Sequence, residues 1–447
     1  MGANDIDGRN SQAYAMSTVR WRIFLLILLV VSINYVDRAS LSVAMPIIAK
    51  QFDLTAGMQG VLLSAFFWSY TLMQVPGGWL ADRFRPRIIV GAATILWGIS
   101  QAATAAVTGW TGLLLARIGL GLAEGPIYPA SGKLNAIWLP ASERARGAVI
   151  IDGGAPLGTA FGSLIIATLI GSLNSWRLAF LIAGLGTVAA GVLAYRYIRN
   201  SPREHPGVNP AELEHIQSGH AREDAQTSSP ERPKAPEASK ASATSPGSVR
   251  RFLRSRSFWG MVLGWLGFDL VFYGLVSWGP SYLAQARHLS LASAGGSLFI
   301  IFGAGFLGEM LGGFLADRWK ARGGSPNRVM RTLLGVSGAL TTLSTFALAF
   351  VSSAGAAVAL LASTLFFLRW AGLYWSLPAT LGERRHAGLL GGIMNAAGNL
   401  GGIVVPIVVG AIVQRTGDYF AALIFFAACG GMYTISSLMI DYSRRCA

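Results

Sequence analysis

The chain has 447 residues, of which 53% are hydrophobic and only 13% are charged. A soluble domain of ordinary composition carries about 25% charged residues, so this chain is not a conventional water-soluble protein. A net charge of +15 would suggest a nucleic-acid partner in a soluble protein. Here the basic residues lie in loops between apolar stretches, where they set the orientation of a membrane protein, and we expect no nucleic-acid partner.

Twelve apolar stretches approach or exceed the length of about 20 residues that a membrane-spanning helix needs. In chain order they cover residues 22–46, 58–80, 88–108, 111–132, 147–172, 177–198, 257–284, 291–316, 328–350, 354–380, 388–413 and 418–441. The first stretch has no small-residue cleavage site, so we interpret it as a retained helix and not as a signal peptide. The sequence predicts an all-α membrane protein with twelve transmembrane helices.

The basic residues are distributed unequally between the two sides of these spans. With the N-terminus inside, the cytoplasmic segments and the cytoplasmic ends of the spans hold 29 of the 36 Lys and Arg residues. The outer loops and the outer ends of the spans hold only Lys50, Arg177, Arg287 and Arg415, while three more residues lie in the interior of spans, namely Arg38, Arg117 and Arg369. This asymmetry predicts a multi-pass protein of the inner (plasma) membrane with both termini in the cytoplasm.

An eight-residue phrase occurs twice, as GGWLADRF at 77–84 and as GGFLADRW at 312–319, 235 residues apart. Such a repeat indicates two related halves, an organisation typical of transporters. We expect a tail at 1–20, six-helix bundles at 21–199 and 257–442, a linker at 200–256 and a tail at 443–447. Residues 227–248 are rich in Ser, Pro, Ala, Lys and Glu, so we expect the linker to be largely disordered, with a short helix at 211–216.

The repeated phrase also suggests a gate at the cytoplasmic surface. Its small residues let two helices approach closely, and its Asp and Arg can bind a neighbouring helix end in one conformation and release it in another. The residues of this predicted gating motif are Gly78, Asp82 and Arg83 in the first copy and Gly313, Asp317 and Arg318 in the second.

Charged residues inside the spans are the main candidates for function. Inserting one at the centre of a membrane helix costs about 2.5–3.5 kcal/mol of free energy on insertion scales, so a charge retained there is expected to have a role. Asp37 and Arg38 are adjacent in the first span, while Arg117 and Glu124 are seven residues apart and share a face of the fourth, so we expect the four charges to form one cluster. A carboxylate balanced between burial and a neighbouring Arg can load and release a proton near neutral pH. The alternative is a static set of ion pairs that holds helices together.

Other polar residues within the spans are weaker signals. Asp269 and Tyr273 are one turn apart in the seventh span, and Asp152 begins the fifth. Glu309 lies 235 residues after Gln74 and reads as structural. The phosphate-binding sequence of ATPases is absent, and the five His and two Cys residues show no metal-ligand spacing, so we expect no ATP, metal or other cofactor.

Four motifs carry a family resemblance. They read NYxDR at 34–38, QVPGG at 74–78, RxxxGxxEGxxYP at 117–129 and NxxGNxGG at 395–402. With the twelve spans and the repeated phrase, the whole chain resembles the major facilitator superfamily, and within it the anion:cation symporters. That group includes bacterial hexuronate, galactonate and glucarate permeases, phthalate permeases and the sialin-type carriers.

The resemblance implies proton-coupled uptake of an organic anion, such as a sugar acid, by alternating access of two bundles in a monomer. It assigns the coupling proton to Asp37 and Glu124 and the substrate carboxylate to Arg38. The other substrate contacts that it implies are Tyr35, Tyr70, Tyr273, Trp375 and Asn395.

Two positions depart from the sugar-acid pattern. Ala155 stands where sugar-acid members often carry Gln, and Gly372 stands where they carry Ser. Both changes remove partners for substrate hydroxyl groups and favour a smaller, aromatic or less hydroxylated carboxylate.

Other functional classes remain open at the level of the sequence. A protein with the same fold could be a proton-driven exporter of a drug or metabolite. It could also be a membrane sensor or a structural component that transports nothing. A membrane enzyme is the most remote alternative, because the chain shows no nucleophile with a neighbouring base.

Overall fold

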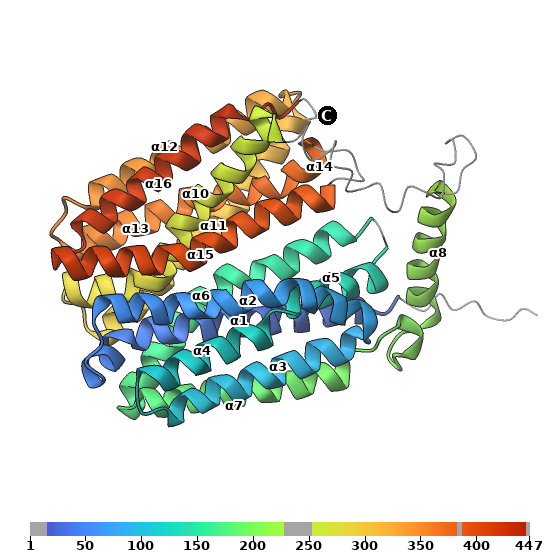
Figure 1. Ribbon diagram of the computed structural model, residues 1–447. Helices are drawn as coiled ribbons and strands as arrows, with labels where there is room; N and C mark the ends of the chain where they lie inside the picture. The colour runs from blue at the N-terminus through green and yellow to red at the C-terminus, as the bar shows by residue number, and fades with distance from the viewer. Residues whose placement is uncertain (1–15, 141, 228–252, 382–386, 444–447) are drawn as a thin grey trace, which may run out of the picture.

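The computed structural model describes residues 16–140, 142–227, 253–381 and 387–443, and the regular structure within these ranges is helical (Figure 1). Helices of the N-terminal half form one bundle. They are α1 (Val19–Gln51), α2 (Ala56–Arg83), α3 (Pro86–Ala103), α4 (Trp110–Glu124), α5 (Ile127–Trp138), α6 (Arg144–Leu173) and α7 (Trp176–Tyr197), with short 3₁₀ turns η1 (Thr104–Ala106) and η2 (Pro202–Glu204).

The helices of the C-terminal half form a second bundle beside the first. They are α10 (Arg256–Ser281), continued by the π-helical η5 (Tyr282–Ala286), α11 (Leu291–Ala321), α12 (Pro326–Leu348), α13 (Ala354–Leu368), the 3₁₀ segment η6 (Arg369–Ser376), α14 (Leu377–Leu381), α15 (Ala387–Thr416) and α16 (Phe420–Met439). Each predicted span coincides with one of these helices or with consecutive ones, so the all-α prediction is confirmed.

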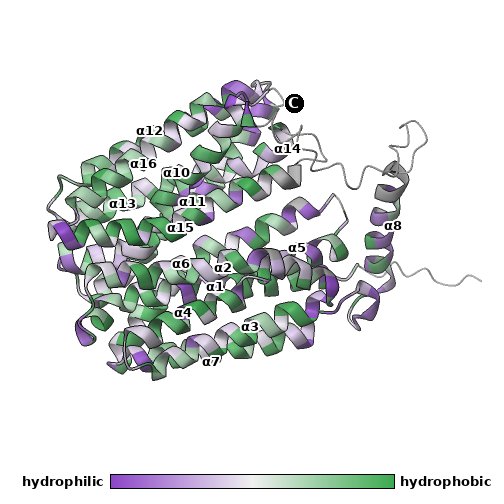
Figure 2. Cartoon of the chain, in the orientation of Figure 1, coloured by the Kyte–Doolittle hydropathy of each residue, from purple (hydrophilic) through white to green (hydrophobic). Residues whose placement is uncertain are grey.

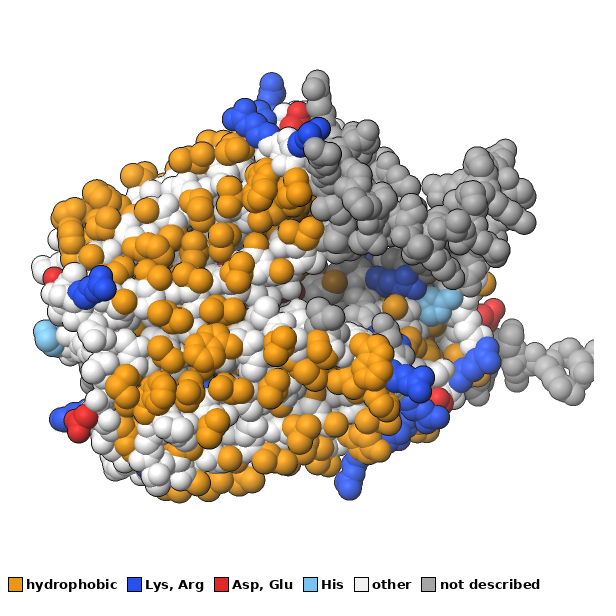
Figure 3. Space-filling model, viewed as in Figure 1, with side chains coloured by type: hydrophobic (Ala, Val, Ile, Leu, Met, Phe, Trp, Pro, Cys, Tyr) orange, Lys and Arg blue, Asp and Glu red, His pale blue; other side chains and the backbone are white. Residues whose placement is uncertain are grey.

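The exterior of both bundles is apolar. Large side chains such as Leu72 and Leu307 are 72% and 62% exposed, which would be costly in water and is expected in lipid. Apolar side chains cover the visible flank of both bundles, whereas α8 (Pro210–Thr227) beside them is polar (Figures 2 and 3). Among the described helices, nine are long and apolar enough to cross a membrane.

Hydroxyl side chains fix the start of several helices. The Thr55 hydroxyl accepts a hydrogen bond from the Met58 amide at 3.3 Å, and the Ser290 hydroxyl accepts one from the Ser293 amide at 3.2 Å. Such caps satisfy backbone donors that have no partner within the helix. They set where α2 and α11 begin at one end of their bundles.

Two of the predicted spans are interrupted helices. The fourth span divides at Gly125 and Pro126, between α4 and α5, because proline cannot donate the hydrogen bond that would continue the helix. The tenth span changes from α-helix to the 3₁₀ segment η6 at Arg369. In each case a charged residue, Glu124 or Arg369, lies at the interruption.

Glycines allow the closest helix contacts within the N-terminal bundle. A Cβ atom on Gly158 of α6 would lie 2.2 Å from the Ser32 carbonyl oxygen of α1, and one on Gly184 of α7 would lie 2.6 Å from the Gly98 carbonyl oxygen of α3. Side chains there would force the helices apart. The pairs α1–α6 and α3–α7 therefore form the tight frame that positions the charged residues.

The bundles touch each other mainly at the end remote from α8. There the Gly57 amide donates to Gln414 Oε1 at 2.9 Å, and the Ser64 hydroxyl donates to the Ile403 carbonyl at 2.7 Å. On the other side of the interface, the rings of Phe161 and Phe299 lie 5.2 Å apart. At the end that carries α8, called here the α8 end, the surface is hollowed between the bundles (Figure 3).

Helix α8 is joined to the N-terminal bundle by a cluster that we call the clasp: Ser17, Arg20, Glu143, Glu212 and His215. The carboxylate of Glu212, fully buried, accepts from the amides of Val19 and Arg20 at 3.1 Å each, from Arg20 Nη1 at 2.9 Å and from Ser17 Oγ at 2.5 Å. It thus caps α1 from another helix.

Glu143, in the turn before α6, completes the clasp. It accepts from Arg20 Nε at 2.8 Å and contacts His215 Nε2 at 3.0 Å. The predicted helix at 211–216 is therefore present and longer than expected, whereas residues 228–252 of the predicted linker lie outside the described part of the chain.

We expect Glu212→Ala to destabilise the protein by about 3–5 kcal/mol, because it leaves Arg20 buried with half of its partners removed. Thermal unfolding and hydrogen exchange of the α8 amides would measure the loss. Glu214→Ala on the exposed face of the same helix is the control. Equal exchange in both variants would contradict the capping role of Glu212.

The contribution of the clasp to the stability of the protein should depend on pH in a definite direction. Partial burial would raise the pKa of Glu143, but the hydrogen bonds from Arg20 and His215 outweigh it and hold that pKa below its ordinary value. The contribution of Glu143 to stability is therefore complete above about pH 4.3, the unfolded-state value, and is lost as the pH falls through the lowered pKa.

Candidate functional site

The central feature of the site is an ion pair between Arg38 of α1 and Glu124 at the end of α4. Arg38 Nε donates to Glu124 Oε2 at 3.0 Å, and the side chains are 6% and 0% exposed. Three aromatic rings surround the guanidinium, with centroids 4.8 Å (Tyr35), 4.6 Å (Phe66) and 4.4 Å (Tyr70) from its carbon. Such rings stabilise a cation that has little access to water.

Asp37 faces away from Arg38, into the N-terminal bundle. Its Oδ2 accepts from Trp97 Nε1 of α3 at 3.1 Å and from Thr187 Oγ1 of α7 at 3.0 Å, and the residue is fully buried. Neighbouring residues on a helix point about 100° apart, which explains why the two charges serve different contacts. Asp37 and Arg38 therefore do not form an ion pair with each other.

Arg117 of α4 lies within electrostatic reach of both carboxylates. Its Nη2 donates to the Arg38 carbonyl at 3.3 Å, and its charge acts on both Asp37 and Glu124. The four charges, two carboxylates and two guanidiniums, balance when all are ionised. The structure therefore brings the predicted cluster of Asp37, Arg38, Arg117 and Glu124 together in the N-terminal bundle.

Several buried polar atoms of this cluster have no hydrogen-bond partner among the described residues. They are Arg38 Nη2, Arg117 Nε, Asp37 Oδ1, Glu124 Oε1 and both amide atoms of Asn34. Unsatisfied buried donors and acceptors are costly unless they serve a ligand or a proton. The cluster has free donors for a carboxylate at Arg38 and a free acceptor for a proton at Glu124.

Arg38 lies in the wall of a small chamber that residues of both bundles line. It is lined by Tyr35, Arg38, Ser42, Leu63, Phe66, Phe67 and Arg117 from the N-terminal bundle and by Phe272, Tyr273, Val276 and Ser277 from α10. The Tyr273 ring lies 4.7 Å from that of Phe67. Of the predicted substrate contacts, Tyr35, Arg38 and Tyr273 line this chamber.

The remaining predicted contacts lie outside its wall. Tyr70 is buried and stacks on Phe66, with 5.3 Å between the ring centroids, but it is not among the residues that line the chamber. Trp375 is 47% exposed, with its ring 5.2 Å from Trp265 in the C-terminal bundle. Asn395 is half-buried on α15. A ligand that reached all of these residues would have to span both bundles.

The C-terminal bundle holds a second group of charges. Arg369, at the start of η6, forms an ion pair with Glu309 of α11, and the side chains are 9% and 14% exposed. The charges of Asp152 on α6 and Asp269 on α10 act on the same arginine. A Cβ atom on Gly372 would lie 3.1 Å from Glu309 Oε1, so the departure from Ser at this position leaves room for the carboxylate.

The gating motif lies at the α8 end. Arg83, Asp317 and Arg318 are exposed, and a Cβ atom on Gly78 or Gly313 would meet nothing within 4 Å. The side chain of Asp82 lies outside the described residues. Within the described part, no ion pair joins the two copies of the motif, in keeping with the hollow between the bundles at this end.

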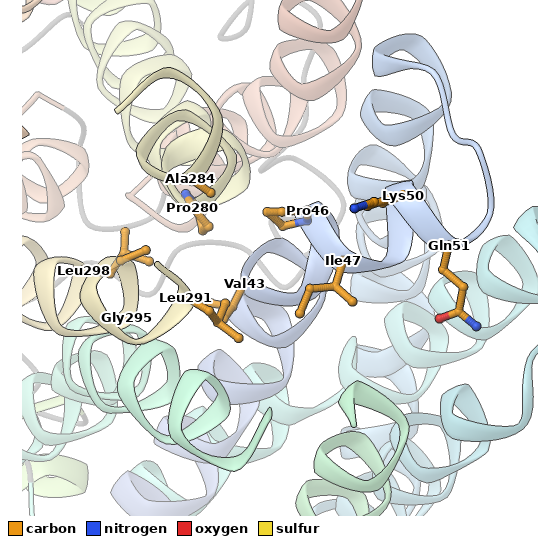
Figure 4. A pocket seen from close by; sticks show the side chains of 11 residues that line it. Val43, Pro46, Ile47, Lys50, Gln51, Pro280, Ala284, Leu291, Gly295 and Leu298 are labelled. Carbon is orange, nitrogen blue, oxygen red and sulfur yellow. The ribbon is translucent and has the colours of Figure 1, made fainter. Parts of the chain in front are cut away.

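A wider pocket, of about 550 Å³, lies between α1, α10, η5 and α11, at the end of α1 that is remote from α8. Its walls are mostly apolar residues such as Val43, Pro280 and Leu298 (Figure 4). Lys50 is its one charged lining residue. It lacks the buried charges of the central chamber, so its size does not make it the candidate site.

Comparisons with known proteins identify the family of the chain. Residues 27–406 match the family model described as Major Facilitator Superfamily. The chain is 30% identical to the probable galactarate/D-glucarate transporter GudP of Escherichia coli, covering 95% of this chain and 94% of that protein. It is also 30% identical to the probable sulfoacetate transporter SauU of Cupriavidus necator, over 92% and 91% of the two chains.

A solved structure has the same fold. The bacterial homolog of the human lysosomal transporter Spinster, in an inward-facing and unoccupied conformation, superposes with a TM-score of 0.71. The identity is 19%, and 95% of each chain is covered. The predicted fold of two related helical bundles is therefore confirmed.

Sequence reasoning missed the two residues that hold Asp37, Trp97 and Thr187. Trp97 is one of thirteen tryptophans in a membrane protein, and no spacing separates it from those at the membrane surface. Thr187 stands in an apolar span without a recognisable motif. Only the packing of α3 and α7 against α1 identifies them.

We expect Arg117→Met to lower stability by about 3–5 kcal/mol, because it leaves two buried carboxylates facing a single guanidinium. The double variant Arg117→Met/Glu124→Gln should recover part of this loss by restoring the balance of charge. Thermal unfolding of the four proteins in a double-mutant cycle measures the coupling. Strictly additive losses would contradict charge compensation at this site.

Proposed function

Since the chain belongs to the major facilitator superfamily, and its relatives are transporters of small organic anions, we propose that it takes up an organic anion together with a proton. The observation that carries the proposal is the buried pair of Arg38 and Glu124 beside a chamber that both bundles line. The pair offers a cation for the substrate carboxylate and an acid for the coupling proton.

The balance of charge supplies the reason for coupling. With two carboxylates and two guanidiniums, the N-terminal cluster is neutral before a substrate arrives. An incoming carboxylate would add a negative charge in a region of low dielectric, which is costly unless a proton enters as well. Glu124 is the acceptor for that proton because it already holds the guanidinium that the substrate needs.

The proposed exchange at Arg38 follows from this arrangement. A proton binds to Glu124, which weakens its ion pair with Arg38 and leaves the guanidinium fork free for a carboxylate. The free Nη2 of Arg38 completes a two-point contact with the substrate. When the carboxylate leaves, Glu124 loses its proton and pairs with Arg38 again.

Asp37 has a different position and therefore a different proposed role. It has no contact with the chamber, but it shares Arg117 with Glu124. When Asp37 is protonated and neutral, the charge of Arg117 acts on Glu124 alone. We therefore propose that Asp37 is a second acid of the coupling cluster and that it acts through Arg117. Trp97 and Thr187 hold it in place.

Transport proceeds by alternating access of the two bundles, which is the general mechanism of this fold. We assign the α8 end to the cytoplasm of the cell, following the distribution of basic residues. The described conformation then opens inward. The two copies of the gating motif, exposed at this end, would meet when the bundles close there.

We expect Glu124→Gln to abolish concentrative uptake driven by a pH gradient, because glutamine cannot take up and release the coupling proton. Exchange of internal for external substrate should persist. Proteoliposomes holding the full chain, with radiolabelled D-glucarate as the first probe, separate the two activities. Glu214→Gln, on the exposed face of α8, is the control. Normal accumulation in the Glu124 variant would remove this residue from the coupling mechanism.

We expect Arg38→Lys to weaken substrate binding by about 10-fold or more, because lysine keeps the charge but lacks the planar fork that binds a carboxylate at two points. Ligand-dependent thermal shift measures the change, since binding stabilises the folded state. The panel should contain D-glucarate, a hexuronate, sulfoacetate and an aromatic acid. A cationic drug that is exported equally well by the variant would favour a proton-driven exporter instead.

A further inference from the structure

The wide pocket between α1, α10, η5 and α11 has the features of a ligand site, and the proposed transport does not use it. We call it the Lys50 pocket, after the one charged residue among its described walls. It encloses about 550 Å³, and cavities of roughly 300–1,000 Å³ with apolar walls and a few polar groups commonly bind small molecules. It shares no described lining residue with the chamber around Arg38, so it is a separate site.

The charge at the rim of the Lys50 pocket is positive. No hydrogen bond or ion pair joins the Lys50 amino group to another described residue, and this group points towards Pro46 in the wall of the pocket (Figure 4). An adjoining pocket shares three lining residues with it and adds Arg177, whose Nη1 donates to two backbone carbonyls at 2.9 and 2.7 Å. Neither pocket has an Asp or Glu among its described lining residues. The rim therefore favours an anion, and Lys50 is the cation free to bind it.

Behind the rim, the walls of the Lys50 pocket are apolar. Ile47 of α1 and Leu298 of α11 are typical of them. Gln51 is the other polar side chain in the described walls, and its Oε1 already accepts a hydrogen bond from Trp176 Nε1 at 2.7 Å. A ligand with many hydroxyl groups would leave most of them without partners, which is costly. One acid group on an apolar body matches these walls.

The position of the pocket favours a ligand from the aqueous phase over a lipid. Gly295, which lines the pocket, lies so close to α6 that a Cβ atom on it would be 2.4 Å from the Ala167 Cβ. An acyl chain cannot pass between two helices in such contact. The rim lies instead at helix ends, because Lys50 is in the last turn of α1 and Leu291 begins α11.

We propose that the Lys50 pocket binds a small amphipathic carboxylate from the aqueous phase at the end remote from α8, and that this ligand inhibits transport. Its acid group lies at Lys50, and its apolar body lies between α1 and α11. Binding at this site is independent of the proposed function, whereas the inhibitory effect rests on the proposed transport by alternating access.

The origin of the walls gives the ligand its effect. Helix α1 belongs to the N-terminal bundle, whereas α10, η5 and α11 belong to the C-terminal bundle. In alternating access, the bundles separate at this end when they close at the α8 end. A ligand held between the two walls then loses its contacts with one of them. It therefore binds the described conformation more tightly and raises the population of that conformation.

Binding is measured with phenylbutyrate as the probe and its uncharged amide as the comparison. The full chain is held in nanodiscs of zwitterionic lipid, and the ligand-dependent rise in unfolding temperature gives the affinity. We expect Lys50→Gln to weaken binding of the acid by about fivefold, the upper end for an exposed ion pair, and to leave binding of the amide unchanged. Arg415→Gln, an exposed cation of the same end outside the pocket walls, is the matched control and should bind as the wild type does.

The effect on conformation is measured as a distance. Cys429 and Cys446 are replaced first. Nitroxide labels at Arg85 and Arg322, both exposed at the α8 end of different bundles, then report the opening. Saturating phenylbutyrate should raise the ratio of long to short distances by about fivefold or more, a coupling of typical size. Ile47→Asp, at an exposed position of the pocket wall, should abolish the rise through its negative charge, whereas the neutral Ile47→Asn should retain it.

The effect on transport has a kinetic signature. A carrier that has delivered its substrate returns through the conformation that the ligand holds. A saturating concentration of D-glucarate should therefore not relieve the inhibition by phenylbutyrate. Relief by saturating substrate would indicate competition in the chamber and would overturn the inhibitory site.

Two further results would overturn the proposal. Binding that survives Lys50→Gln but is lost in Arg38→Lys would mean that the probe occupies the chamber. A distance change produced by anionic lipid without the probe, and lost in Lys50→Gln, would assign the pocket to a lipid. If the protein did not transport D-glucarate, the binding and distance measurements would still decide whether the Lys50 pocket is a ligand site, so the two proposals can fail separately.

Discussion

Compensation of buried charge is the constraint on which this structure depends. A guanidinium inside a membrane protein must have a carboxylate or another acceptor, and Arg38 finds Glu124 at 3.0 Å. The pair is stable only while nothing competes for the guanidinium. In the proposed mechanism, a substrate carboxylate is such a competitor, and a proton on Glu124 releases the guanidinium. Binding and coupling would then be two consequences of one electrostatic balance.

Both bundles contain buried charged residues, but the balance of acids and arginines differs between them. In each, an interrupted span places a charged residue at the interruption: Glu124 where α4 ends, and Arg369 where α13 becomes a 3₁₀ segment. The N-terminal cluster has equal numbers of acids and arginines, whereas the C-terminal cluster has an excess of acid. The repeated phrase at 77–84 and 312–319 reflects the common architecture of the two bundles. The balance of acids and arginines distinguishes their two charged clusters.

Much of the fold could be predicted from the sequence, because a membrane helix is a local property of about 20 apolar residues. The cluster of Asp37, Arg38, Arg117 and Glu124 could be predicted from the rarity of charges within spans, but the specific pairing of Arg38 with Glu124 could not. The orientation of Asp37 towards Trp97 and Thr187 could not be predicted, since it depends on how α3 and α7 pack around α1. The ion pair of Glu309 with Arg369 could not be predicted either, since it depends on how α11 packs against η6. The trans-helix cap by Glu212 depends in the same way on a tertiary contact.

That cap restricts how the N-terminal bundle can move. Arg38 lies nineteen residues beyond Val19, about 28 Å along α1 from the point where α8 grips the helix. Sliding α1 along its axis, or turning it, would break every bond that Glu212 makes to its first turn. The helix that carries Arg38, the proposed substrate-binding arginine, is thus fixed at its first turn. If the N-terminal bundle rotates to change access to the chamber, α8 therefore moves together with the start of α1.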